Sequence, residues 1–434
     1  MLWSVLWMRS SRASRAVSSG RLRGAAVAAP TRARHKRLGV WVLAPFCLAV
    51  CCGDAHSDAE EPAQEAAREP WKIQEARVRF NYFNQKGFGY QSQAGPGPKG
   101  SERLYVYEPM FYLRVRQNPK VEHTVTIPID VITSASTDAI DATTSASRYN
   151  EAGTIQINTR VDTTDDDTVN VVYGGHGEEW YASIFGGVGY TRDLAQDNAT
   201  ITVRVDGSFD WFNPYGHRPG GVVPEGNEWD FRGAFGGNVE VSQILNPTTW
   251  VKAGYGITWQ KGELFTPWNS VPFLCDPTVS VCIGRIREKF PGTRLKQTVS
   301  GLLVHYLPRT SSTVRLSYRF FADDYDVRAH TLLGEFYQYI TERAYINAHY
   351  RAHHQTAVYF WTNNLGLPLD LSAPRTADSD LAEFWAHEFG VKVLFHLTPP
   401  GRTHQHDMDV YYNRYTRTND LTVDVVSIGY GYTF

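Results

Sequence analysis

The sequence lacks several features that would place it in a familiar class. Beyond residue 52 no stretch reaches the ~18 consecutive apolar residues that a membrane-spanning helix needs. The 43 basic and 45 acidic residues leave a net charge of −2, which offers no basic surface for nucleic acid. A sustained helical period is almost absent as well. What the chain does have is 24 tyrosines, 21 phenylalanines and 12 tryptophans, although it is polar on average.

Cysteine is also scarce, and its distribution divides the chain. Three of the five cysteines fall before residue 53, where the basic stretch Arg32–Arg37 precedes the apolar run Leu38–Cys52. A basic segment followed by roughly 15 apolar residues predicts a secretory signal peptide, too short to span a membrane. We therefore expect residues 1–55 to hold an extension and this signal, 56–72 to form a short periplasmic lead-in, and 73–434 to form the folded domain.

From residue 73 onward, apolar and polar residues alternate with a period of two. In the last segment Val426, Ile428, Tyr430, Tyr432 and Phe434 share one face, and small residues share the other. Successive side chains of a strand point to opposite faces, so this pattern predicts a strand with one apolar side. Similar segments recur about sixteen times; fourteen is the alternative, because the stretches near 168–173 and 408–413 are the weakest.

The links between these segments also follow a pattern. Links near 117–120, 193–198, 246–249, 308–312 and 341–344 are short, whereas those near 85–101, 133–150, 214–227, 262–292 and 362–380 are long. Short turns on one side and long loops on the other are typical of membrane-spanning barrels. Backbone groups in hydrocarbon must all be paired, which an open sheet cannot achieve. The sequence thus predicts an all-β, antiparallel up-and-down transmembrane barrel with short periplasmic turns and long extracellular loops.

Two resemblances add to this prediction. The end of the chain resembles the closing strand of an outer-membrane barrel, in which Tyr430, Tyr432 and Phe434 would form the membrane-insertion signal. The stretches 130–136, 318–324, 329–331 and 350–355 resemble the outer-membrane family catalogued as domain of unknown function 3570. That resemblance implies a barrel in the cell outer membrane with no established activity, catalytic residue or cofactor. It implies lipids and the barrel-assembly machinery as partners, and a periplasmic redox protein as a further one.

One interior segment, residues 344–361, carries a charged stripe. An arginine at the bilayer midplane costs about 2–4 kcal/mol, so this stripe should face the lumen, as a solvated wall or as a selectivity filter. The predicted lumen-lining set is Arg315, Arg319, Glu335, Asn347, His349, Arg351, His353 and Gln355. On the opposite face we expect Ile346, Ala348, Tyr350, Ala352, Val358 and Phe360 to contact lipid.

Other candidate sites are weaker. Cys275 and Cys282 share one long loop and predict a disulfide in an oxidising compartment. His404 and His406 could bind zinc but supply only two of its four ligands, so we expect no metal. Ser134, Ser136, Ser145 and Ser147 have no histidine nearby in the sequence to activate them, which argues against a hydrolase. The favoured function is a non-enzymatic pore or solute-binding conduit. The alternatives are a scaffold for a periplasmic redox partner and, less favoured, an outer-membrane hydrolase.

Overall fold

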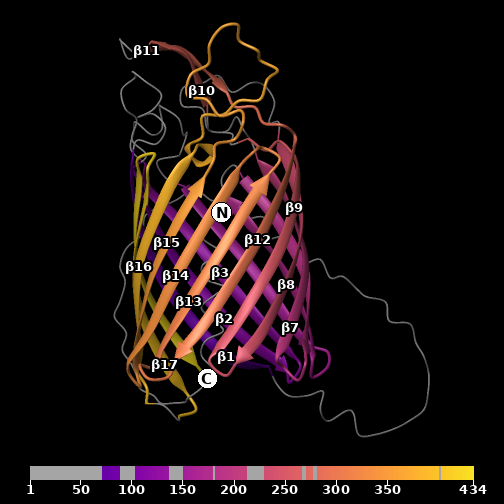
Figure 1. The fold of residues 1–434 in the computed structure, drawn as a ribbon, viewed down its shortest axis with the longest axis vertical. Coiled ribbons are helices and arrows are strands. Elements are labelled where there is room, and N and C mark those ends of the chain that lie inside the picture. The colour runs from indigo at the N-terminus through magenta and orange to yellow at the C-terminus, as the bar shows by residue number, and fades with distance from the viewer. Residues whose placement is uncertain are drawn as a thin grey trace, which may run out of the picture.

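Sixteen antiparallel strands close into one barrel in the computed structural model (Figure 1). The structure describes residues 71–87, 103–135, 150–178, 181–212, 229–265, 270–276, 281–399 and 402–434. The predicted signal region and Ser136, Ser145 and Ser147 lie outside these ranges, whereas Ser134 belongs to a strand and not to a loop. The barrel strands are β1 (Lys72–Gly87), β2 (Leu104–Asn118), β3 (Val121–Ala135), β4 (Asn150–Asp162), β5 (Asp167–Glu178), β6 (Tyr181–Leu194), β7 (Ala199–Phe212), β8 (Asp230–Asn246), β9 (Thr249–Gly262), β12 (Thr293–Leu307), β13 (Ser312–Asp323), β14 (Arg328–Thr341), β15 (Ala344–Gln355), β16 (Phe384–His396), β17 (Gln405–Arg417) and β18 (Leu421–Thr433). The predicted fold class and the count of sixteen are confirmed, and the two weakest segments are the full strands β5 and β17.

Each strand pairs with its neighbour in the chain, except where β12 pairs with β9. The first and last strands meet along thirteen paired positions, from Glu75 opposite Thr433 to Gly87 opposite Leu421. The Phe434 backbone N–H donates to the Gln74 carbonyl, 3.0 Å away, at the end of this seam. Closure therefore leaves no free edge in the sheet.

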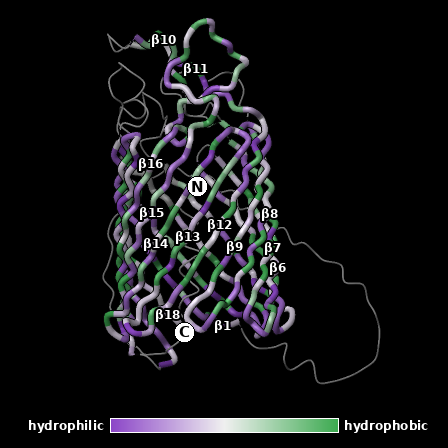
Figure 2. Tube along the Cα trace, in the orientation of Figure 1, coloured by the Kyte–Doolittle hydropathy of each residue, from purple (hydrophilic) through white to green (hydrophobic). Residues whose placement is uncertain are grey.

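The strand alternation gives the barrel its two surfaces, visible as alternating colours along each strand in Figure 2. Along β18, Val426, Ile428 and Tyr430 are exposed on the outside, whereas Val425 and Ser427 are buried on the inside. The outer surface is therefore largely apolar and the inner surface largely polar. No helix in the described ranges is long and apolar enough to cross a membrane.

The two ends of the barrel differ. At the turn end, where β1 begins and β18 ends, the links are 119–120, 163–166, 195–198, 247–248, 308–311, 342–343 and 397–404. The opposite end, the loop end, carries the long links, including 263–292 and 356–383. Three links there, 179–180, 324–327 and 418–420, are short as well. Long loops thus join only some strand pairs.

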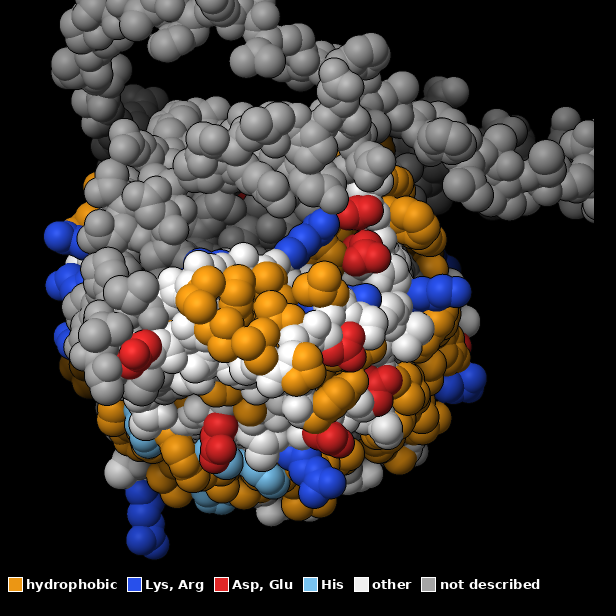
Figure 3. All heavy atoms as spheres, turned by 90° about the horizontal axis from the view of Figure 1, so that it is seen from above, with side chains coloured by type: hydrophobic (Ala, Val, Ile, Leu, Met, Phe, Trp, Pro, Cys, Tyr) orange, Lys and Arg blue, Asp and Glu red, His pale blue; other side chains and the backbone are white. Residues whose placement is uncertain are grey.

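The described parts of the links 263–292 and 356–383 form a cap at the loop end. The first holds the hairpin β10 (Ser270–Asp276) and β11 (Val281–Arg287), and the second holds the short 3-10 helix η3 (Ser379–Leu381). The two links join through backbone pairs between Phe273 and Leu365 and between Lys289 and Arg375. Apolar side chains gather on the face of the molecule that Figure 3 shows from above. Among the described cap residues, Leu367 and Leu371 are exposed.

The cap corrects one prediction. β15 ends at Gln355, so Val358 and Phe360 do not continue its lipid-facing side. Both are buried against Tyr325 and Val327, because the chain turns inward at the rim and the Tyr359 N–H donates to the Tyr325 carbonyl. An alternating pattern at the end of a strand cannot distinguish a membrane surface from the core of a loop.

Candidate functional site: the lumen wall

The predicted lumen residues come from three adjacent strands, β13, β14 and β15. All eight alternate with outward neighbours such as Leu316, Tyr318, Phe336 and Tyr350, which are exposed on the outer surface. The structure therefore places the set on the inner face. Gln355 also connects β15 to the cap at the rim. Its side-chain amide donates to the Asp380 and Ala382 carbonyls of the cap, at 2.8 and 2.9 Å.

Glu388 on β16 is the centre of the first inward cluster, and its side chain is almost fully buried. Arg351 Nε lies 2.9 Å from Glu388 Oε2, and His349 Nε2 lies 3.4 Å from Oε1. The His349 ring lies over Gly390, where an added Cβ would come within 2.1 Å of it, and stacks on Tyr411. The sequence marked His349 and Arg351 but missed their role as partners of Glu388, which lies on the neighbouring strand.

A second cluster joins β13 to β14. Arg315 Nε lies 3.5 Å from Glu335 Oε2, and the Tyr337 hydroxyl donates to Glu335 Oε1 at 2.9 Å. Arg315 Nη1 in turn donates to the Tyr337 oxygen at 3.2 Å. Nearby, the Thr331 hydroxyl lies 2.8 Å from His353 Nδ1. These inward charges are thus paired along the wall.

A third cluster crosses the closing seam. Arg79 on β1 donates through Nη2 to both carboxylate oxygens of Asp409 on β17, at 2.9 and 2.8 Å, and through Nη1 to Ser427 at 2.8 Å. Gly429 on β18 lies between them, paired with both Arg79 and Asp409 in the strand register. A side chain at Gly429 would occupy the path of this ion pair, since a Cβ there would lie 2.7 Å from Asp409 Oδ1.

The opposite side of the lumen is lined differently. The wall formed by β5 to β9, called here the sparse wall, combines larger inward residues such as Phe185, Arg204 and Glu240 with inward glycines, namely Gly174, Gly187, Gly189, Gly236, Gly254 and Gly256. Asp206 faces inward on β7 and is nevertheless exposed, whereas Glu388 and Asn413 across the barrel are covered by neighbouring side chains. Arg319, which faces inward on β13, is exposed as well, so inward side chains reach solvent on both sides of the lumen.

Beneath the cap, aromatic rings form a series of contacts across the loop end of the barrel, from one side of its rim to the other. Phe212 on β7 packs edge-on against Phe265, and Phe290 packs edge-on against Tyr325 and Phe360. Arginines lie over these rings: Arg232 over Phe212 at 5.6 Å, Arg287 over Phe265 at 4.2 Å and Arg294 over Tyr325 at 4.7 Å. Burial raises the pKa of the Tyr325 hydroxyl, which donates to the Pro291 carbonyl at 2.6 Å. The cap is thereby fixed to the barrel rim.

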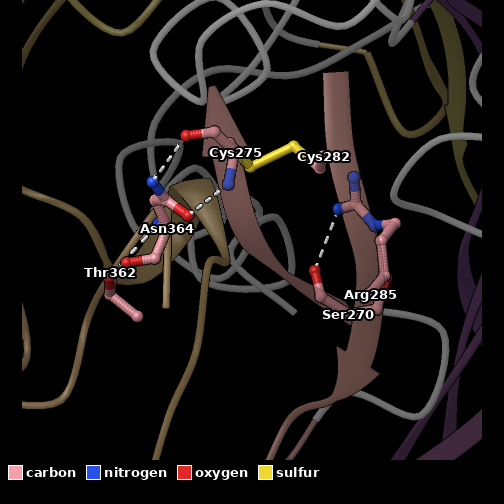
Figure 4. Close-up of a disulfide and its surroundings, with 6 residues drawn as sticks. All are labelled: Ser270, Cys275, Cys282, Arg285, Thr362 and Asn364. Carbon is pink, nitrogen blue, oxygen red and sulfur yellow. Dashed lines mark hydrogen bonds between the residues drawn. A yellow bond between two sulfur atoms is a disulfide. The ribbon is translucent and has the colours of Figure 1, made fainter. Parts of the chain in front are cut away.

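The cap also contains the two cysteines. Cys275 and Cys282 face each other across β10 and β11 and form a disulfide with an S–S distance of 2.08 Å (Figure 4). Asn364, from the other cap link, accepts from the Cys275 N–H at 3.0 Å and donates to its carbonyl at 3.3 Å. Within the described ranges no group of three metal-ligating side chains occurs.

The family model described as "Protein of unknown function (DUF3570)" matches residues 152–427. No curated protein matches the sequence. A BenF-like porin from Pseudomonas fluorescens Pf-5 is similar with a TM-score of 0.44 and 9% identity, over 83% of this chain and 99% of that one. A FadL homologue from Pseudomonas aeruginosa is similar with a TM-score of 0.38 and 12% sequence identity, over 86% of this chain and 92% of that one. The siderophore receptor PirA from Acinetobacter baumannii gives 0.40 and 9%, over 79% of this chain but 53% of the receptor, so this chain spans about half of the receptor's length.

Proposed function

The chain belongs to the DUF3570 family of proteins of unknown function, and we propose that it is an outer-membrane conduit through which a small water-soluble solute crosses. The observation that carries this proposal is the pairing of an apolar outer face with a polar inner face that is open at Asp206. Barrels of about sixteen strands are wide enough to leave an aqueous channel when no domain fills them.

The outer face supports placement in a membrane. Large apolar side chains are exposed outward along the strands, such as Phe209, Phe231, Phe235 and Trp259. A water-soluble monomer rarely exposes apolar surface on this scale, whereas a barrel in lipid requires it. The disulfide in the cap fits an oxidising compartment, which both the periplasm and the cell exterior provide. The long links at the loop end support placing that end outside the cell and the turn end in the periplasm.

The inner face supports conduction. On the side formed by β13 to β18 and β1, long side chains pair across intervening strands, as Arg79 does with Asp409. On the sparse wall, inward glycines leave room for neighbouring polar side chains, such as Arg204 beside Gly189 and Asp206 beside Gly236. The solute path is thus a polar lumen, lined by paired charges and exposed at Asp206 on one side and at Arg319 on the other.

Planar lipid bilayers test this function. The protein refolded in detergent should produce discrete current steps, and the same preparation after heat unfolding should produce none. Folded barrel that inserts into the bilayer yet carries no current would contradict the conduit and would favour a closed scaffold.

A further inference from the structure

Lys296 on β12 differs from most inward cations of the barrel. Lys252 forms an ion pair with Glu240 at 2.8 Å, and Lys392 lies 3.7 Å from Asp409. Lys296 faces the lumen and is half-buried, yet no ion pair or hydrogen bond of its ammonium group occurs among the residues that the structure describes. Arg204, which also lacks an ion pair in the described ranges, has Asp206 two residues away on the same face of β7.

The charged groups close enough to act on Lys296 are Arg294, Asp323 and Arg232. Asp323 is directly opposite Lys296 in the strand register, but its carboxylate is already occupied. One oxygen accepts from the Tyr325 and Val327 N–H groups, both at 3.0 Å, and the other accepts from Arg294 Nε at 2.8 Å. The Asp323 side chain is fully buried, so it cannot swing out to meet the lysine.

The neighbouring arginine is held on a different aspartate. Arg232 Nε donates to Asp210 Oδ2 at 2.8 Å, and the Ser183 hydroxyl donates to the other oxygen of Asp210 at 2.7 Å. Stacking of Arg232 on Phe212 and of Arg294 on Tyr325 fixes both guanidinium groups in place. Three cations therefore share two carboxylates, and the excess positive charge is that of Lys296.

We propose that Lys296 binds the carboxylate of a small organic solute on its way through the lumen, an inference that rests on the conduit function. A single excess charge matches a monoanion better than a doubly charged phosphate. Lys296 lies at the edge of the sparse wall, where its register partner on β9 is Thr258, and Gln260 follows on the same face. The hydroxyl and amide groups supply neutral hydrogen-bonding partners for the same solute. The site lies just below the cap, so a solute entering from the loop end meets it early.

Two measurements test the site. In the folded protein, trinitrobenzenesulfonate labelling of each lysine is followed by mass spectrometry in potassium acetate and in potassium chloride at equal ionic strength. Acetate should slow labelling of Lys296 and leave the paired Lys252 unchanged. Equal labelling of Lys296 in the two salts would overturn the proposal whether or not the barrel conducts.

The second measurement is the reversal potential in a potassium acetate gradient. We expect the acetate-to-potassium permeability ratio to fall about threefold in K296M and to be kept in K296R, because the excess charge attracts the anion across a short distance. K252M removes the same charge from a paired position and is the matched control. An equal fall in K252M would overturn a specific site. Absence of current from the wild-type protein would instead contradict the conduit function, and the labelling result would then decide the site alone.

Discussion

At the residue scale, glycine decides where inward charges can lie. Gly390 leaves room for the His349 ring, and Gly429 leaves room for the ion pair between Arg79 and Asp409. Gly390 lies on β16, between the strands of His349 and its stacking partner Tyr411. Gly429 lies on β18, between the strands of Arg79 and Asp409. The sequence predicted small residues on the inner face of β18 but could not predict what crosses them, because Arg79 and Asp409 are separated by 330 positions.

Replacing Gly429 should therefore weaken the closing seam. In G429V the new side chain displaces Arg79 from Asp409 and leaves a buried charge without its partner, a loss of about 3 kcal/mol in the free energy of unfolding. Urea unfolding in detergent measures this loss. G301V is the control, because Gly301 on β12 has nothing within 4 Å of an added Cβ. Equal stability of the two variants would show that the ion pair does not hold the seam.

At the scale of elements, the cap depends on a buried acid, Glu288, which joins its two links. Its Oε1 accepts from the Thr376 hydroxyl at 2.6 Å and from the Ala377 N–H at 3.1 Å. Burial and the nearby Asp378 raise the pKa of Glu288 to about 8. The folded cap thus keeps a proton that an opened cap, with an ordinary glutamate pKa, releases at lower pH.

The cap should consequently open more easily as the pH rises. The equilibrium constant for cap closure is at its maximum below the ordinary pKa of glutamate. It falls by up to about tenfold per pH unit as the pH approaches 8, and it levels off above that value. Hydrogen exchange of residues 281–289 and 375–381 measures the opening. E288Q, which stays neutral, should show no such fall. Parallel pH profiles for the two proteins would refute the role of Glu288.

The disulfide should stiffen the cap without supporting the barrel, because β10 and β11 form a sheet of their own. Closing so short a loop is worth about 2 kcal/mol, and the double variant C275S/C282S should lose this locally while the barrel unfolds as before. On intact cells, an impermeant maleimide should label both cysteines only after reduction. Labelling before reduction would contradict the disulfide, and labelling only after the outer membrane is opened would contradict the sidedness.

The strands could be predicted from the sequence, whereas the cap could not. A period of two marks β13 or β18 directly, since one face of each strand is apolar along its whole length. Val271 packs against Ala377 of the other cap link, and Val358 and Phe360 pack against Tyr325 and Val327 of the link between β13 and β14. No local period records such contacts. For the same reason, His349 and Arg351 were predictable as part of an inward stripe, but their partner Glu388 on the next strand was not.

At the scale of the whole molecule, closure depends on the last strand. The Tyr432 and Phe434 rings pack edge-on at 4.4 Å, and the Phe434 backbone pairs with Gln74 at the start of β1. Deleting Phe434 should lower the amount of heat-modifiable barrel in the outer membrane several-fold, whereas F434Y should keep it. Normal levels of the truncated chain would show that the terminal aromatic is not an insertion signal.

The central claim, a water-filled passage through the lumen, is tested most directly at two adjacent positions of β7. Asp206 faces the lumen and Val205 faces outward. In a C275S/C282S background reconstituted in lipid bilayers, a charged, water-soluble thiol reagent should label D206C and change the current. V205C, which faces lipid, should stay unlabelled with its current unchanged. Equal reaction at both positions, or no reaction at D206C, would contradict the account.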